Sequence, residues 1–173
     1  MISTLQKETT VRNELSSFYR DNGFGEDGGK QLKFAKIKMG WFSFYIPNTE
    51  SRKKALFFHD VHHLATGYGT DLCGEAEISA WEIGSGCGNF WAAWVLDSFG
   101  LIMGIFIAPR RTWRAFWLGR KCRNLYHGLM AKEEIMGANL NDIRILIGFP
   151  SQHDLGFAQT TTDGNGHLKT KIN

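Results

Sequence analysis

The feature that most constrains the fold of this chain is a pair of helical segments separated by a short glycine turn. Thr49 or Ser51 can cap the start of the first segment, and Gly67 stands where a left-handed C-terminal cap is expected. After the turn, Thr70 can cap a second segment that runs to about Gly84. The pattern therefore predicts two consecutive antiparallel helices.

The rest of the chain fits one mainly α-helical domain. With 173 residues, 43% of them hydrophobic, it can form one packed core and is too short for two ordinary domains. We expect this domain at 31–150. Residues 32–46 alternate polar and apolar side chains and favour a small N-terminal β-hairpin, with a helix as the alternative.

The two ends of the chain are expected to lie outside that domain. Residues 1–22 can form a short amphipathic helix with little core, and a glycine-rich stretch follows, so 1–30 is predicted to be mobile. The polar residues 151–173 show no periodicity and predict a disordered tail.

Charge and cysteine content exclude some classes. Twenty basic and seventeen acidic residues give a net charge of +3, too little for a dedicated nucleic-acid binder. The cysteines, Cys73, Cys87 and Cys122, form no C-x-x-C pair, which favours a reducing compartment. The N-terminus has no apolar run typical of a secretory signal, so a cytoplasmic location is expected.

Three histidines and an aspartate fall within the five residues HDVHH of the first helical segment. Side chains at i and i+4 lie on one helix face, so His59 and His63 can converge on one point, whereas Asp60 turns roughly 100° away. Glu75 is the first carboxylate candidate on the next helix. We interpret the group as a site for one divalent metal, zinc first and iron, cobalt or manganese as alternatives, rather than as a solvated helix face.

Two other enzyme classes share part of this pattern. HDVHH matches the H-x-x-H-H box of membrane desaturases and hydroxylases, but those enzymes need several boxes, and the remaining histidines, His127, His153 and His167, are scattered. A metal-dependent phosphohydrolase would pair its His-Asp with a distant histidine and aspartate. An unrelated metal-dependent hydrolase is kept as an alternative.

The motif resembles the signature of the Coq-four family of ubiquinone biosynthesis. H-D-x-x-H, eleven residues and a glutamate match at His59, Asp60, His63 and Glu75. Weaker similarity continues through WLGRKCRNLYHGLM and NLNDIRILIGFP, so it covers roughly residues 55–149. The chain departs from the family in its short length and in the predicted hairpin at its N-terminal side.

The resemblance implies a helical fold with a metal held by His59, Asp60, His63 and Glu75. It also implies peripheral association with the inner membrane, other ubiquinone-synthesis proteins as partners, and oxidative decarboxylation of a prenylated aromatic ring; a homodimer is kept open. The ligand would be a prenylated quinone precursor or another isoprenoid lipid, and an enzyme would have His62 or Glu82 as a nearby acid-base group. A non-catalytic lipid-binding scaffold with a structural metal is the alternative.

A nearly uncharged run at 90–108 follows the second helix. Its nineteen residues approach the length of a membrane span, but the central Asp97 would cost roughly 2.5 to 3.5 kcal/mol in a bilayer. We therefore expect a buried helix.

A basic cluster follows the run, interleaved with Trp113, Phe116 and Trp117. This composition favours a membrane-interface face, or a site for the phosphate or carboxylate of a ligand, over an ordinary solvated face. The residues predicted to bind lipid or anion are Arg110, Arg111, Arg114 and Arg120.

Overall fold

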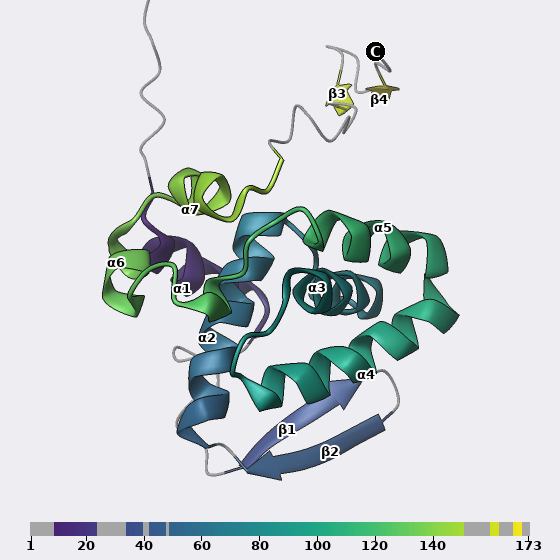
Figure 1. Cartoon of the computed structure of the whole chain (residues 1–173). Coiled ribbons are helices and arrows are strands. Elements are labelled where there is room, and N and C mark those ends of the chain that lie inside the picture. Colours follow the sequence, from purple (N-terminus) through teal and green to yellow (C-terminus); the bar gives the residue numbers. More distant parts are fainter. Residues whose placement is uncertain are drawn as a thin grey trace, which may run out of the picture.

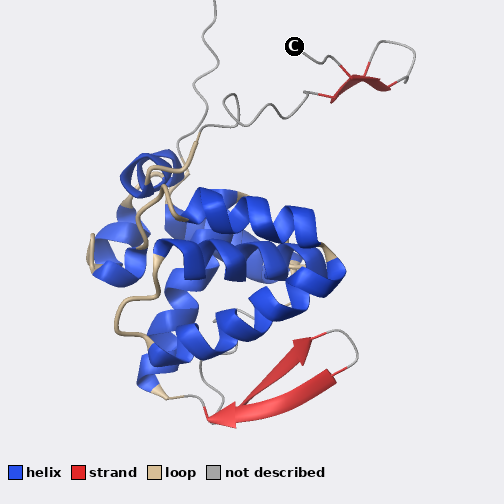
Figure 2. Cartoon of the chain, turned by 45° about the vertical axis from the view of Figure 1, so that its right-hand side comes forward, coloured by secondary structure: helices blue, strands red, loops and turns tan. Residues whose placement is uncertain are grey.

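The computed structural model describes residues 9–23, 34–39, 42–47, 49–150, 160–162 and 168–170. The fold is a mainly helical single domain, as predicted (Figures 1 and 2). Its helices are α1 (Val11–Asp21), α2 (Glu50–Thr66), α3 (Leu72–Ser85), α4 (Trp91–Ile107), α5 (Pro109–Gly119), α6 (Lys132–Gly137) and α7 (Leu140–Ile147), with a 3₁₀ turn η1 (Leu125–His127). Its strands are β1 (Phe34–Met39), β2 (Phe42–Pro47), β3 (Thr160–Thr162) and β4 (Leu168–Thr170).

The strands form two small antiparallel pairs. β1 pairs with β2, from Phe34 opposite Pro47 to Met39 opposite Phe42, which agrees with the predicted hairpin. Figures 1 and 2 both place this hairpin on the α4 side of the helices. β3 pairs with β4 inside the region predicted to be disordered, and the rest of 151–173 lies outside the described residues.

Local signals define the helix pair α2 and α3. Thr49 Oγ1 accepts a hydrogen bond from the Arg52 N–H at 3.2 Å, and α2 ends at Gly67 with φ 75°, a left-handed conformation that glycine adopts without steric cost. The predicted cap of α3 is wrong by one residue. Asp71 accepts from the Gly74 N–H, whereas Thr70 donates to Asn22 at 2.5 Å.

Helix α3 lies at the centre of the domain, between α4 and α5 (Figure 1). A Cβ added at Gly84 would collide with the Phe116 carbonyl, and one added at Gly119 would collide with the Trp81 carbonyl. The backbones of α3 and α5 are therefore in direct contact, and only glycine fits at these two positions.

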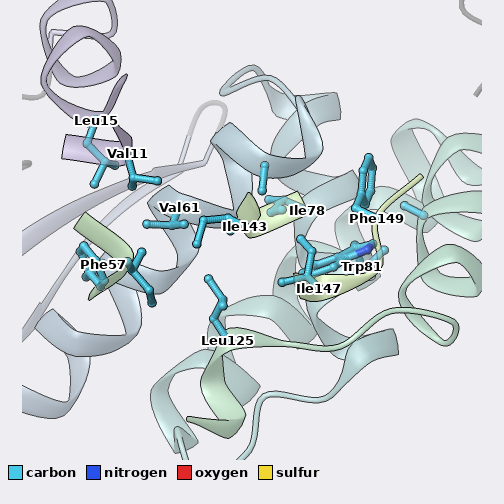
Figure 3. Close-up of a cluster of buried hydrophobic side chains, with 14 of the residues drawn as sticks. Val11, Leu15, Phe57, Val61, Ile78, Trp81, Leu125, Ile143, Ile147 and Phe149 are labelled. Atoms are coloured by element: carbon cyan, nitrogen blue, oxygen red, sulfur yellow. The ribbon is translucent and has the colours of Figure 1, made fainter. Parts of the chain in front are cut away.

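The main core joins α1, α2, α3 and α7, and Figure 3 shows its largest members. Trp81 and Ile78 of α3 are fully buried in it, and Val11 and Leu15 of α1 pack against the same cluster. The expectation of little core in residues 1–22 is thus wrong for Val11–Asp21, because the apolar side of this helix packs on α2 and α6.

The predicted buried helix at 90–108 is also wrong. Helix α4 fully buries only small residues and Asp97; Leu96, Leu101 and Met103 are half-buried, and most of its other large side chains are exposed, among them Phe106 at 80% and Trp91 at 61%. In the part of the chain that the structure describes, no helix combines the length and apolar character needed to cross a membrane.

Candidate metal centre

The candidate site lies where α2 passes the first turn of α3. The Nε2 atoms of His59 and His63, one helical turn apart on α2, are 3.1 Å from each other. Glu75 on α3 brings its two carboxylate oxygens to 3.6 Å from His59 Nε2 and 3.5 Å from His63 Nε2. The structure therefore places three of the four predicted ligands together.

These distances suit a metal ion. Bonds of about 2.0–2.1 Å at tetrahedral angles hold neighbouring ligand atoms about 3.3 Å apart. The three separations around the histidine pair, 3.1, 3.5 and 3.6 Å, lie close to that value. Zinc and other divalent metals that accept imidazole and carboxylate are consistent with this set.

The other nitrogen of each histidine fixes its orientation. His63 Nδ1 lies 2.9 Å from the Tyr68 carbonyl oxygen, which can only accept, so Nδ1 carries the proton. His59 Nδ1 lies 3.0 Å from Glu82 Oε2 and donates to that carboxylate. In the neutral state that metal binding requires, Nδ1 is the donor of both rings, and two Nε2 lone pairs and the Glu75 carboxylate face one point.

Asp60 lies outside this group. Its Oδ2 accepts a 2.7 Å hydrogen bond from the Tyr19 hydroxyl of α1, and the side chain is buried. The 100° step between neighbouring residues of a helix turns it away from the side that carries His59 and His63. The prediction that Asp60 is a metal ligand is therefore not supported by the geometry.

The two predicted acid-base residues, His62 and Glu82, are both fully buried. The Leu125 N–H donates to His62 Nε2 at 3.3 Å, so His62 Nδ1 carries the proton and donates to Glu82 at 2.5 Å. Both ring nitrogens of His62 already form hydrogen bonds within the protein, so the structure does not favour an acid-base role for this residue. Glu82 instead acts as a shared acceptor for His59, His62 and the Tyr126 hydroxyl.

Asp97 of α4 also approaches this network. It is buried, and one of its oxygens lies within 4.8 Å of ligand atoms of both His59 and Glu82. The Cys87 thiol donates to Asp97 Oδ2 at 3.4 Å. Sequence reasoning used Asp97 only as an argument against a membrane span; its isolation as the single charge in an apolar run was the available signal for a buried partner.

Burial and the neighbouring charges shift the pKa values of these groups in opposite directions. Burial alone would lower the pKa of His59, but the Glu82 charge and the bonds to Glu75 and Glu82 raise it well above normal. Burial would raise the pKa of Glu75, yet its contacts with His59 and His63 lower it to about 2. Burial, followed by the Glu82 charge, raises the pKa of Asp97 well above its usual range.

A second feature is a basic pocket of about 640 Å³ at the C-terminal end of α2, which is also lined by residues of α3, α5 and α7. Arg111 and Arg114 of the predicted anion site line it, and Arg110 and Arg120 do not. Arg111 is bound to Glu77 through two hydrogen bonds. The aromatic and additional basic side chains of its wall are Tyr68, Trp113, Trp117, Phe149, Lys121 and Arg144.

No family model matches the chain, and neither a curated protein nor a solved structure matches it significantly. The resemblance to the Coq-four family therefore rests on the motif residues, and it stays a prediction.

Proposed function

We propose that this chain is a metal-binding protein of the ubiquinone-biosynthesis type, which binds a prenylated quinone precursor at a membrane surface. The observation that carries the proposal is the convergence of His59 Nε2, His63 Nε2 and Glu75 on one point. Two Nε2 lone pairs and a carboxylate this close together repel one another, and either a metal ion between them or a proton on His59, whose pKa is raised well above normal, relieves that repulsion. The Coq-four resemblance of the same residues supports the choice of ligand.

The number of protein ligands favours an enzyme over a scaffold. Catalytic zinc sites have three protein ligands and a position for water or substrate, whereas structural sites have four. Among the described residues, the group around His63 supplies three, because Asp60 is held by Tyr19. The alternatives are a carrier that presents the lipid to partner enzymes and an unrelated metal-dependent hydrolase.

The proposed reaction replaces the ring carboxyl group with a hydroxyl group. The carboxyl carbon leaves as CO₂, one oxygen atom of dioxygen enters the ring, and an external two-electron donor with two protons reduces the other atom to water. Zinc has no redox chemistry, so this reaction requires a redox-active metal such as iron, which two histidines and one carboxylate can hold; it would activate dioxygen and supply Lewis acidity toward the ring carboxylate or phenol oxygen. Glu82 and the Tyr68 carbonyl hold the two imidazoles in place.

The basic pocket supports an anionic ligand with an apolar body. Arg114 and Lys121 provide positive charge on its wall, while Trp113, Trp117 and Phe149 provide apolar surface. Tyr68 lines the pocket and also accepts the hydrogen bond of His63, so the pocket and the histidine pair share one residue.

Metal analysis of protein purified without chelator tests the proposal. We expect about one divalent metal per chain in the wild type and strong loss in His63→Ala and Glu75→Ala. The exposed His127, changed to alanine, is the matched control and should keep the metal. Negligible metal in both wild type and His63→Ala would eliminate the site.

The same wild-type and His63→Ala proteins distinguish the enzyme hypothesis from the carrier hypothesis. A prenylated aromatic acid with an isotopically labelled carboxylate is incubated with the metal-loaded protein, dioxygen and a reductant. Release of labelled CO₂ by wild type and not by His63→Ala supports the enzyme. Tight binding of the acid without release of CO₂ supports the carrier.

A further inference from the structure

Tyr68, in the turn that joins α2 to α3, contacts both the metal centre and the basic pocket. Its carbonyl oxygen accepts the hydrogen bond from His63 Nδ1 at 2.9 Å. Its ring lines the pocket and lies perpendicular to the Phe149 ring, with 6.2 Å between the two ring centroids. The backbone of one residue therefore orients a metal ligand, while its side chain forms part of the wall of a second site.

The turn also packs directly on the first turn of α3. A Cβ added at Gly74 would collide with the Gly69 carbonyl, so the two backbones are in contact. Asp71 strengthens the same place by accepting a 2.9 Å hydrogen bond from the Gly74 N–H. Glu75 follows Gly74 directly in the sequence. A displacement of the turn would therefore affect the position of Glu75 as well as the orientation of His63.

The pocket offers a ligand direct contact with Tyr68. Within the described part of the chain, the Tyr68 hydroxyl has no hydrogen-bond partner, and burial raises its pKa, so it remains a neutral donor. Arg114 lies close enough for its charge to act on this hydroxyl. Lys121 lines the same pocket, and neither cation forms an ion pair with another described residue. An anion held by these cations can therefore also accept a hydrogen bond from Tyr68.

The turn is the part of this region with the greatest backbone freedom. Arg144 of α7 donates to the carbonyls of Ala65 at 2.9 Å and Leu64 at 3.3 Å, which fixes the end of α2. Tyr68 follows this end between Gly67 and Gly69, and glycine has access to more backbone conformations than any other residue. The position of Tyr68 can therefore depend on what it binds.

We propose that Tyr68 is a positioning residue that couples the two sites, so that the metal and an anionic ligand with an apolar body in the pocket each increase the affinity of the protein for the other. Metal binding needs His63 with its proton on Nδ1, and the Tyr68 carbonyl stabilises this form. A ligand that binds the Tyr68 side chain favours the same position of the turn. Two ligands that favour one conformation bind cooperatively, and the effect is reciprocal. The inference rests on the metal site and the pocket of the proposed function.

Calorimetric titration of the full chain tests the coupling. The metal is zinc, which has no redox chemistry, and the pocket probe is octylbenzenesulfonate, an anion with an apolar body whose sulfonate is a poor metal ligand. We expect the zinc Kd to fall at least about fivefold with saturating probe, and the probe Kd to fall by the same factor with saturating zinc. Equal zinc Kd values with and without bound probe overturn the proposal.

Variants of two pocket residues locate the coupling. Tyr68→Ala keeps the backbone carbonyl but lacks the ring, so zinc should bind, the probe should bind more weakly, and each ligand should no longer affect the other. Trp117→Ala is the matched control, because it removes another aromatic side chain from the same pocket, and no contact among the described residues joins Trp117 to His63. It should weaken probe binding and retain the coupling factor of the wild type.

The coupling factor distinguishes a positioning role of Tyr68 from a structural role. Loss of packing alone would change the affinities and leave the coupling factor as in the wild type, so equal factors in Tyr68→Ala and wild type overturn the assignment. Tyr68→Phe retains the packing on Phe149 and lacks only the hydroxyl. It preserves the fold and should give a coupling factor between those of wild type and Tyr68→Ala.

The same titrations separate this inference from the proposed function. Zinc and probe that bind the wild type independently remove the coupling and leave both sites in place. Binding of zinc without binding of the probe removes the pocket and the coupling, and leaves the metal centre. Absence of zinc binding removes the metal centre together with the coupling.

Discussion

The carboxylate of Glu82 on α3 accepts a 3.0 Å hydrogen bond from Nδ1 of His59 on α2. Glu82 is fully buried, and the two histidines that it contacts lower its pKa well below normal although burial opposes this shift. The negative charge at this position therefore orients His59 and makes its Nε2 a stronger electron donor toward a metal.

Replacing Glu82 with glutamine tests this relationship. His59 and His62 bind different carboxylate oxygens of Glu82, and glutamine replaces one of these oxygens with an NH₂ donor, so one of the two Nδ1–H groups loses its acceptor. We expect metal affinity to fall roughly 10- to 100-fold and stability without metal to fall by about 1–3 kcal/mol. Metal titration and denaturant unfolding measure the two effects. Glu133→Gln, at an exposed glutamate of α6, should change neither.

The hydrogen bond between Tyr19 and Asp60 gives a second prediction. Tyr19→Phe removes a 2.7 Å bond to a buried carboxylate and should destabilise the fold by about 1.5–3 kcal/mol without changing metal content. Asp60→Asn should also keep about one metal per chain. If Asp60→Asn loses the metal as completely as His63→Ala, Asp60 is a ligand and the full motif set of the Coq-four resemblance applies.

The contact between α3 and α5 gives a third prediction. Gly84→Ala places a methyl group against the Phe116 carbonyl of a packed backbone, so we expect a loss of about 1–3 kcal/mol or more. Gly137→Ala, at a helical position with nothing within 4 Å, should be neutral or slightly stabilising. Urea unfolding of the two variants separates close packing from the general effect of losing a glycine. Equal stability would mean that the helices can move apart.

The burial of α1 gives a fourth prediction. Leu15 is 3% exposed in the main core, so Leu15→Ala should cost about 2–5 kcal/mol, whereas a mobile segment would tolerate it. Ile145→Ala, at the exposed isoleucine of α7, should change stability by less than about 0.5 kcal/mol. Thermal unfolding of both variants provides the comparison, and an unchanged midpoint for Leu15→Ala would exclude α1 from the core.

Parts of the fold that depend on local signals were predictable from sequence. Thr49 and Gly67 mark the ends of α2 through hydrogen bonding and a left-handed turn, both properties of neighbouring residues. The convergence of His59 and His63 follows from helix geometry, and the approach of Glu75 follows from the short turn that joins α2 to α3, although these helices cross rather than run antiparallel as predicted.

Features that depend on distant packing were not predictable in the same way. In α4 both sides are apolar, so hydropathy does not tell which side faces the protein; the decision comes from Gly100 and Gly104 fitting against α3. The role of Asp60 depends on Tyr19, which lies 41 positions earlier in the chain. Asp97 reaches the histidine network only because α4 folds back on α3.

The joining of α1 to the loop before α7 has a consequence for the order of folding during synthesis. The Val11 N–H donates to the Ala138 carbonyl at 2.9 Å, and Thr10 forms an isolated bridge with Asn139. Val11 precedes Ala138 by 127 positions (138 − 11), which a ribosome translates in roughly 6 to 25 s at about 5–20 residues per second. Throughout that interval α1 lacks its backbone contacts with Ala138 and Asn139. The stacking of Phe18 on His63 and the hydrogen bond from Tyr19 to Asp60 therefore reach their final stability late in synthesis. The histidine pair in the nascent chain can therefore bind a metal ion before α1 contacts Ala138 and Asn139.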